Sequence, residues 1–149
     1  MNRSIEEQLQ KDGFLLKLTI GKSMEPMLHQ WQEQPVIKVL GRKPKRFDVV
    51  LFKRNNGQYV LHRIIGMKGD RYRIRGDNCY ETELVSSSQL LGILEGFYRG
   101  ERYIDCEKDK AYRFYVYWHC FVFPFRYGYL RIRSFAAHCY RRLLRRAQK

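Results

Sequence analysis

Short apolar segments separated by turn-forming residues run from residue 14 to residue 100, and they constrain the fold more than any other feature. Each segment is six to eleven residues long and rich in β-branched and aromatic residues: FLLKLTI, PVIKVL, DVVLFKR, YVLHRIIG, RYRIRG and LLGILEGFYRG. NNG stands between LFKR and QYVLHR, and Asn-Gly readily adopts the positive φ angles of a tight hairpin turn. The pattern predicts a mostly β domain of closely spaced antiparallel strands.

A short helix is expected before the first strand. Ser4 is a suitable N-cap, Glu7 completes a capping box three residues later, and Gly13 is a suitable stop. A chain of 149 residues can bury one core of ordinary size. We therefore predict a β domain over residues 1–105, followed by a basic and aromatic tail over residues 106–149.

The tail carries most of the net positive charge. The net charge of the chain is +14, and residues 111–149 contain nine Lys or Arg residues and no Asp or Glu. The first part of the tail, AYRFYVYWHCFVFPFRYGYLRI, is free of charge only over residues 114–125. This stretch is shorter than the ~20 residues that a transmembrane helix needs. The second part, SFAAHCYRRLLRR, has helical periodicity, with apolar residues on one side and arginines on the other.

Three interpretations of the tail remain open. An aromatic segment followed by a basic amphipathic helix is typical of an anchor at an anionic membrane surface, and we favour this interpretation. In the second, the aromatic residues pack on the β domain and the arginines face solvent. Nucleic acid is the third and weakest interpretation. It is considered because stacking aromatics and arginines also suit single strands.

The cysteines and the N-terminal residues bear on location. Cys79, Cys106, Cys120 and Cys139 show neither a C-x-x-C pattern nor a Cys/His spacing suited to zinc, and no metal or other cofactor is expected. No secretory signal is recognisable in the polar sequence MNRSIEEQLQKDG. We therefore expect free thiols and a cytoplasmic protein, peripheral on the inner face of the membrane if the tail is an anchor.

Three polar residues of the β domain are candidates for a catalytic site. Ser23, in GKSMEPML, follows Gly21 and precedes a proline that restricts the chain, so it is expected at the mouth of a rigid turn. His62, in YVLHRIIG, alternates with apolar residues, and such surroundings lower the pKa of an imidazole and keep it a neutral proton acceptor. Asp77 stands in a Gly-Asp-Asn turn. Each also has an ordinary explanation: a serine in a turn, a core histidine, and an aspartate bonded to its own backbone.

The order of these residues resembles the conserved boxes of the signal peptidase I and LexA-like serine peptidase superfamily. Over roughly residues 12–100 the boxes stand in the family's order: GKSMEPML, RFDVVLFKR, YVLHRIIGMKGD, RGDNCYETE and LLGILEGFYRG. The resemblance implies a barrel-like assembly of coiled antiparallel sheets. It also implies that Ser23 is the nucleophile, and that His62 is the base, as in the branch typical of the endoplasmic reticulum. Asp77 would be a functional aspartate, and a second acidic position falls near Glu83, where the family usually has Asp.

We therefore predict a serine endopeptidase that cleaves a peptide or protein precursor by a Ser–His mechanism. Backbone N–H groups at Gly21–Ser23 would stabilise the oxyanion, and residues around Met24 would line the cleft. The resemblance suggests an extended substrate that binds as an added strand. We also predict that a chain cut after about Asp109 still cleaves peptides.

Some features of the family are not recognisable in the sequence. They are the N-terminal transmembrane anchor of the signal peptidases, and the helix-turn-helix domain and Ala-Gly cleavage site of the LexA-like repressors. Housekeeping secretion and autoproteolytic repression are therefore not expected. The alternative function is a catalytically inactive peptidase-like domain that binds peptides or nucleic acid through its basic tail.

Overall fold

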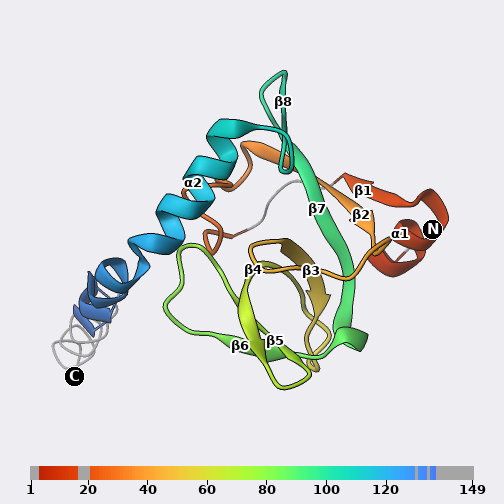
Figure 1. The fold of residues 1–149 in the computed structure, drawn as a ribbon. Helices are drawn as coiled ribbons and strands as arrows, with labels where there is room; N and C mark the ends of the chain where they lie inside the picture. The colour runs from red at the N-terminus through yellow and green to blue at the C-terminus, as the bar shows by residue number, and fades with distance from the viewer. Residues whose placement is uncertain (1–3, 17–20, 130, 134, 137–149) are drawn as a thin grey trace, which may run out of the picture.

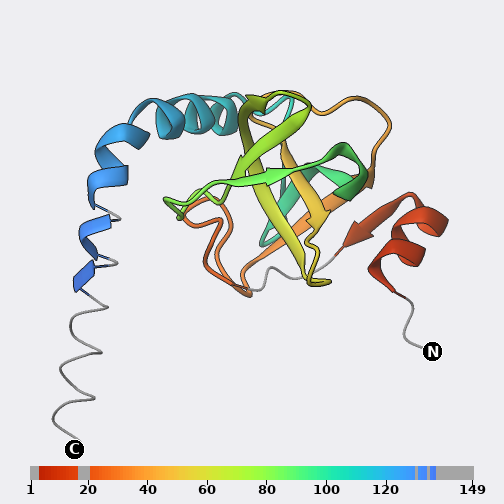
Figure 2. The same ribbon diagram turned by 90° about the horizontal axis from the view of Figure 1, so that it is seen from below.

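A twisted antiparallel sheet forms the body of the protein (Figures 1 and 2). The computed structural model describes residues 4–16, 21–129, 131–133 and 135–136. The strands follow in sheet order: β1 (Phe14–Leu16), β2 (Glu33–Val39), β7 (Leu90–Arg99), β3 (Val49–Lys53), β4 (Tyr59–Lys68), β5 (Arg71–Arg75) and β6 (Glu83–Val85), with β8 (Arg102–Asp105) paired to β7. The mostly β fold predicted from the sequence is confirmed. The sheet curls, but among the described residues β1 and β6 each pair on one side only, so it is not a closed barrel.

The N-terminal helix α1 (Ile5–Asp12) has the caps that the sequence predicts. The Ser4 hydroxyl accepts a hydrogen bond from the Glu7 N–H at 3.1 Å, and the Glu7 carboxylate accepts one from the Ser4 N–H at 3.1 Å. Gly13, with φ of +74°, ends the helix in the left-handed conformation that glycine tolerates. The caps set the helix directly before β1, at one end of the sheet.

The β3–β4 hairpin positions His62. Its turn closes with a hydrogen bond from the Arg54 N–H to the Gln58 carbonyl at 2.8 Å, and Gly57 supplies a φ of +84°. The Asn-Gly sequence therefore marks the hairpin, as predicted. The resulting register places His62 opposite Val50 in the middle of the sheet.

Strand β3 is buried on both faces, as expected for a central strand of a curled sheet. Val49 and Leu51 belong to the larger core cluster, while Val50 and Phe52 belong to a second cluster. The ring of His62 lies 6.1 Å from that of Phe52, centroid to centroid. The imidazole is thus placed beside the apolar second cluster.

The helix α2 (Lys110–Phe121) is N-capped by Asp109, whose carboxylate accepts a hydrogen bond from the Tyr112 N–H at 2.8 Å. Tyr112 and Val116 are buried in the larger core cluster, so this part of the predicted tail packs on the sheet. Residues 123–129 are again helical, and they run away from the sheet (Figures 1 and 2). The domain boundary between residues 105 and 106 stays a prediction, and most of the expected amphipathic helix SFAAHCYRRLLRR lies outside the described residues.

No helix in the described part of the chain has the length and apolar content needed to cross a membrane.

Candidate active site

Ser23 lies in the loop between β1 and β2. Gly21 has a φ of +98°, which favours glycine at this position. The loop is held by its buried side chains Met24 and Leu28, and the Leu28 N–H donates to the Met24 carbonyl at 3.0 Å. Ser23 itself is half-buried. The loop is therefore packed, and its serine remains accessible from one side.

Ser23 and His62 line the same cleft, which has a volume of about 380 Å³. The other walls are mainly apolar and come from α1, β1, the serine loop, β2, β3 and β4: Ile5, Leu15, Met24, Pro35, Ile37, Leu51, Tyr59, Val60 and Leu61. Arg54 and Cys79 complete the lining. Two residues distant in sequence thus line one mainly apolar cleft.

The Gly-Asp-Asn turn connects the serine loop to the histidine. A Cβ atom added to Gly76 would lie 2.6 Å from the Ser23 carbonyl oxygen and 2.9 Å from Nε2 of His62. Asn78 fixes the serine loop, because its backbone N–H donates to the Ser23 carbonyl at 2.8 Å. The Asn78 side-chain amide donates to the Lys22 carbonyl at 2.9 Å. The Nε2 edge of His62 and the backbone of Ser23 therefore both lie against the same glycine.

The other ring nitrogen of His62 faces Glu83. Nδ1 lies 3.4 Å from Oε1 of Glu83, and among the described residues it has no hydrogen bond of good geometry. Arg54 holds this carboxylate with two hydrogen bonds, from Nε and Nη2 at 2.6 Å each. Hydrogen bonding by Arg54 lowers the pKa of Glu83, so the carboxylate is ionised next to the imidazole.

His62 is a neutral imidazole at neutral pH. Its side chain is buried, and burial lowers its pKa below the ordinary 6.5, against the opposing effect of the Glu83 charge. The positive charge of Arg54 lowers it further. The apolar surroundings inferred from strand alternation are therefore present, and they have the expected effect on the imidazole.

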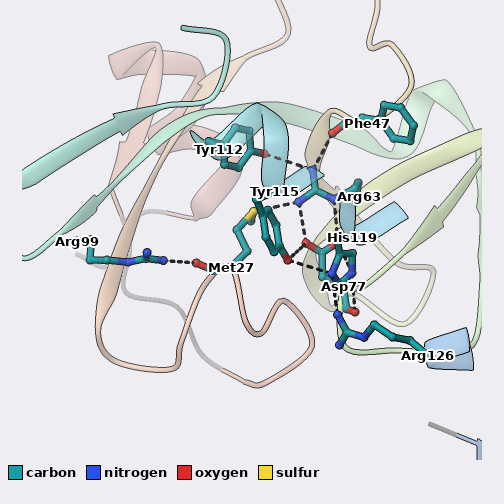
Figure 3. Close-up of polar contacts among 9 residues, drawn as sticks. All are labelled: Met27, Phe47, Arg63, Asp77, Arg99, Tyr112, Tyr115, His119 and Arg126. Atoms are coloured by element: carbon teal, nitrogen blue, oxygen red, sulfur yellow. Dashed lines mark hydrogen bonds and ion pairs between the residues drawn. The ribbon is translucent and has the colours of Figure 1, made fainter. Parts of the chain in front are cut away.

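Asp77 is engaged elsewhere (Figure 3). The Arg63 guanidinium donates to both of its carboxylate oxygens, from Nε at 2.8 Å and from Nη2 at 2.7 Å. The Tyr115 hydroxyl also donates to the carboxylate at 3.1 Å. Burial acts to raise the pKa of Asp77, but the charge and hydrogen bonds of Arg63 bring it below its usual range. Asp77 is thus an ionised, buried group whose contacts brace the turn, while Glu83 is the carboxylate beside His62.

Helix α2 holds the same turn through a second histidine. His119 Nε2 lies 3.1 Å from the Asp77 carbonyl oxygen, and its Nδ1 lies 2.7 Å from Nη1 of Arg126. Because a guanidinium only donates, Nδ1 is the acceptor and Nε2 carries the proton that is donated to the carbonyl. Burial lowers the pKa of His119, consistent with this neutral form. Tyr115 and His119 therefore attach α2 to the Gly-Asp-Asn turn, and Arg126 joins the following helical residues to His119 (Figure 3).

Several residues of this site were missed by the sequence analysis. Arg63 had one usable signal, a charged residue in the middle of an apolar strand. Tyr115 and His119 were placed in the tail, because nothing in an almost uniformly aromatic segment indicates which side packs. Arg54 looked like an ordinary turn residue, and its pairing with Glu83 depends on the strand order.

The structure also bears on the cysteines. Cys79, Cys106 and Cys120 are free thiols, as predicted, and Cys139 lies outside the described residues. Within the described ranges, no three His, Cys, Asp or Glu side chains are grouped so that they could hold a metal ion.

Comparison with known proteins identifies one family. A family model described as signal peptidase, peptidase S26, matches residues 13–103. The matched segment includes Ser23, His62, Asp77 and Glu83, whereas α2 lies beyond it. No curated protein matches the chain.

Proposed function

Because the chain belongs to the signal peptidase family, peptidase S26, we propose that it is a serine endopeptidase that cleaves a precursor or leader peptide. The observation that carries the proposal is the shared cleft: Ser23 and the buried His62 both line it, and Nε2 of His62 and the Ser23 carbonyl oxygen both lie against Gly76.

In the proposed reaction Ser23 Oγ attacks the scissile carbonyl, and Nε2 of His62 takes its proton. The same nitrogen then protonates the leaving amine. This sequence needs the resting proton on Nδ1, and Glu83 lies on that side at 3.4 Å. As the imidazolium forms, the Glu83 carboxylate stabilises its charge and keeps the ring in place.

The oxyanion would be stabilised by backbone N–H groups of the turn at Gly21–Ser23. Neither the Lys22 N–H nor the Ser23 N–H donates a backbone hydrogen bond to another described residue. The left-handed conformation of Gly21 lets the chain turn sharply at this point. Donors that are fixed before the substrate arrives are the usual basis of transition-state stabilisation in acyl transfer.

The substrate would be an extended peptide with small or apolar side chains next to the scissile bond. The cleft walls are apolar, and β1 pairs on one side only, with β2, among the described residues. An open strand edge beside a cleft suits a peptide that adds as a further strand, because the backbone supplies affinity and the cleft supplies specificity.

Peptide cleavage tests this function. Wild type, Ser23→Ala and the control Ser87→Ala are incubated with a pool of extended peptides that contain small and apolar sites, and the products are identified by mass spectrometry. Ser87 is an exposed serine in the short 3₁₀ helix before β7 (Ser87–Gln89), and it does not line the cleft. We expect identical cuts by wild type and Ser87→Ala and none by Ser23→Ala. Equal cutting by Ser23→Ala would exclude Ser23, and no cutting by wild type would favour an inactive peptide-binding domain.

A further inference from the structure

The helix α2 presents two faces of opposite character. The face toward the sheet buries Tyr112, Val116 and His119. The opposite face carries Phe114, Trp118, Phe121 and, in the following helical residues, Phe125. We call these four residues the aromatic ridge. The spacing of four and three residues places Phe114, Trp118 and Phe121 on one side of α2, and Phe125 follows in the next helical segment after the interruption at Val122.

The aromatic ridge is uncovered. Its members are 70%, 57%, 74% and 80% exposed in chain order, and the rings of Phe114 and Trp118 stack nearly parallel with their centroids 6.5 Å apart. Beyond the ridge, further exposed side chains with large apolar parts follow: Tyr129, Ile132 and Phe135. A contiguous exposed apolar surface of this kind marks an interaction site.

The charges around the ridge are positive. Arg113, Arg131 and Arg133 flank it, and within the described ranges none of them forms an ion pair with a carboxylate. The excess continues along the sequence, since residues 111–149 hold nine basic residues and no acidic ones. An occupant of this surface must therefore offer an apolar region and negative charge together.

We propose that the aromatic ridge docks on the surface of an anionic lipid bilayer. Its rings enter the boundary between headgroups and acyl chains, and the arginines contact the lipid phosphates. Trp and Tyr favour this boundary, and the aliphatic part of an arginine side chain lies along apolar surface while its charged end stays with the headgroups.

A second copy of the chain is a poorer occupant, because the same excess of positive charge would meet itself. Nucleic acid would complement the positive charge, but it would offer no apolar contact to the exposed aliphatic side chain of Ile132. Lipid satisfies both the apolar and the charged parts of the surface.

The chain holds its own probe for this proposal. It contains two tryptophans, Trp118 in the ridge and Trp31, an exposed residue in the loop before β2. Trp31→Phe leaves Trp118 as the single reporter, and Trp118→Phe leaves Trp31. Full-length protein of each variant is titrated with vesicles of phosphatidylcholine alone and of phosphatidylcholine with phosphatidylglycerol. We expect a blue shift of the fluorescence only for Trp31→Phe and only with the anionic vesicles.

Co-sedimentation with the same vesicles gives the strength of binding. The double variant Trp118→Ser/Phe121→Ser should lower the partition coefficient by about tenfold or more, whereas Trp31→Ser should leave it unchanged. Because the ridge is exposed, circular dichroism and thermal unfolding should be those of wild type. The measurement needs no catalysis, so Ser23→Ala protein should bind vesicles equally well, and a failure of lipid binding is distinct from a failure of the proposed peptidase activity.

Other outcomes would overturn the proposal. Binding without a shift of Trp118 would mean contact through charge alone. A shift that appears without vesicles as protein concentration rises would assign the ridge to a second copy. Tighter binding to a single-stranded oligonucleotide than to anionic vesicles, lost in the double variant, would assign it to nucleic acid.

Discussion

Two carboxylates in this protein are each held by an arginine and each lie near a histidine, but their surroundings differ. Glu83 is bound by Arg54 and is about one-third exposed, and the His62 Nδ1 beside it makes no good hydrogen bond among the described residues. Asp77 is bound by Arg63 and is almost fully buried.

The two histidines differ in the same way. Both nitrogens of His119 are occupied, one by Arg126 and the other by the Asp77 carbonyl. His62 instead lines the cleft with Ser23. The same residue types thus build a group suited to proton transfer in one place and a structural brace in the other, and the difference is whether the histidine keeps a nitrogen available.

The largest effect is expected from removing α2. A chain that ends after Asp109 loses Tyr112 and Val116 from the core and the contacts of Tyr115 and His119 with Asp77. We therefore expect the cooperative thermal transition to be lost and peptide cleavage to be abolished, contrary to the expectation from the sequence. A chain that ends after residue 136 keeps every contact described above and is the matched control. Full cleavage by the shorter chain would show that the brace is dispensable.

The two carboxylates should differ sharply in their contribution to stability. Asp77→Asn leaves the charge of Arg63 buried without its partner, and we expect the free energy of unfolding to fall by ~3–5 kcal/mol. Glu83→Gln breaks a partly exposed pair, and the loss should be at most ~1 kcal/mol. Urea denaturation of both variants measures the difference. Equal losses would contradict a structural role for Asp77 and a chemical role for Glu83.

Gly76 joins the two regions and tolerates no side chain. In Gly76→Ala the new methyl group would lie less than 3 Å from the Ser23 carbonyl oxygen and from His62 Nε2, so at least one of these groups must shift. Misplacement by this amount should lower kcat/KM by about 100-fold. Gly41→Ala has nothing within 4 Å of its methyl group and should keep wild-type cleavage. Steady-state kinetics on one cleaved peptide gives both values, and a fully active Gly76→Ala enzyme would argue against this contact.

The smallest effect concerns pH. The pKa of His62 is depressed by burial, so cleavage should be retained at pH 7 and lost as the pH falls through a value below 6.5. The Glu83 charge opposes this depression, and Glu83→Gln should therefore move the acid limb of kcat/KM to lower pH while reducing kcat by about tenfold. His119→Gln should leave the position of the limb unchanged. If His119→Gln shifted the acid limb of kcat/KM, the limb would have to be assigned to His119 and not to His62.

Much of the scaffold could be predicted from local sequence signals. The capping box at Ser4, the glycine stop at Gly13 and the Asn-Gly hairpin depend on neighbouring residues, and the structure shows all three. The burial of His62 followed from the alternation of its strand. These features need no knowledge of distant contacts.

The partners of the site could not be predicted in the same way. Strand alternation predicts that Arg63 and His62 lie on opposite faces of the sheet. The pairing of Arg63 with Asp77 also requires the turn after β5 to reach the face on which Arg63 lies, and local sequence does not indicate this. The position of Glu83 beside His62 depends on where β6 begins and on Arg54 in a different turn. The role of α2 was hidden because aromatic residues occupy both its packed and its exposed face.

The central proposal is that Ser23 and His62 act as one catalytic unit, and a double-mutant cycle in peptide cleavage tests it most directly. The kcat/KM of one cleaved peptide is measured for wild type, Ser23→Ala, His62→Ala and the double variant, each shown to be folded by circular dichroism. We expect each single substitution to lower kcat/KM by about 10⁴-fold or more and the double substitution to lower it no further. Losses that multiply in the double variant, or a His62→Ala enzyme that cleaves at nearly the wild-type rate, would contradict the shared mechanism.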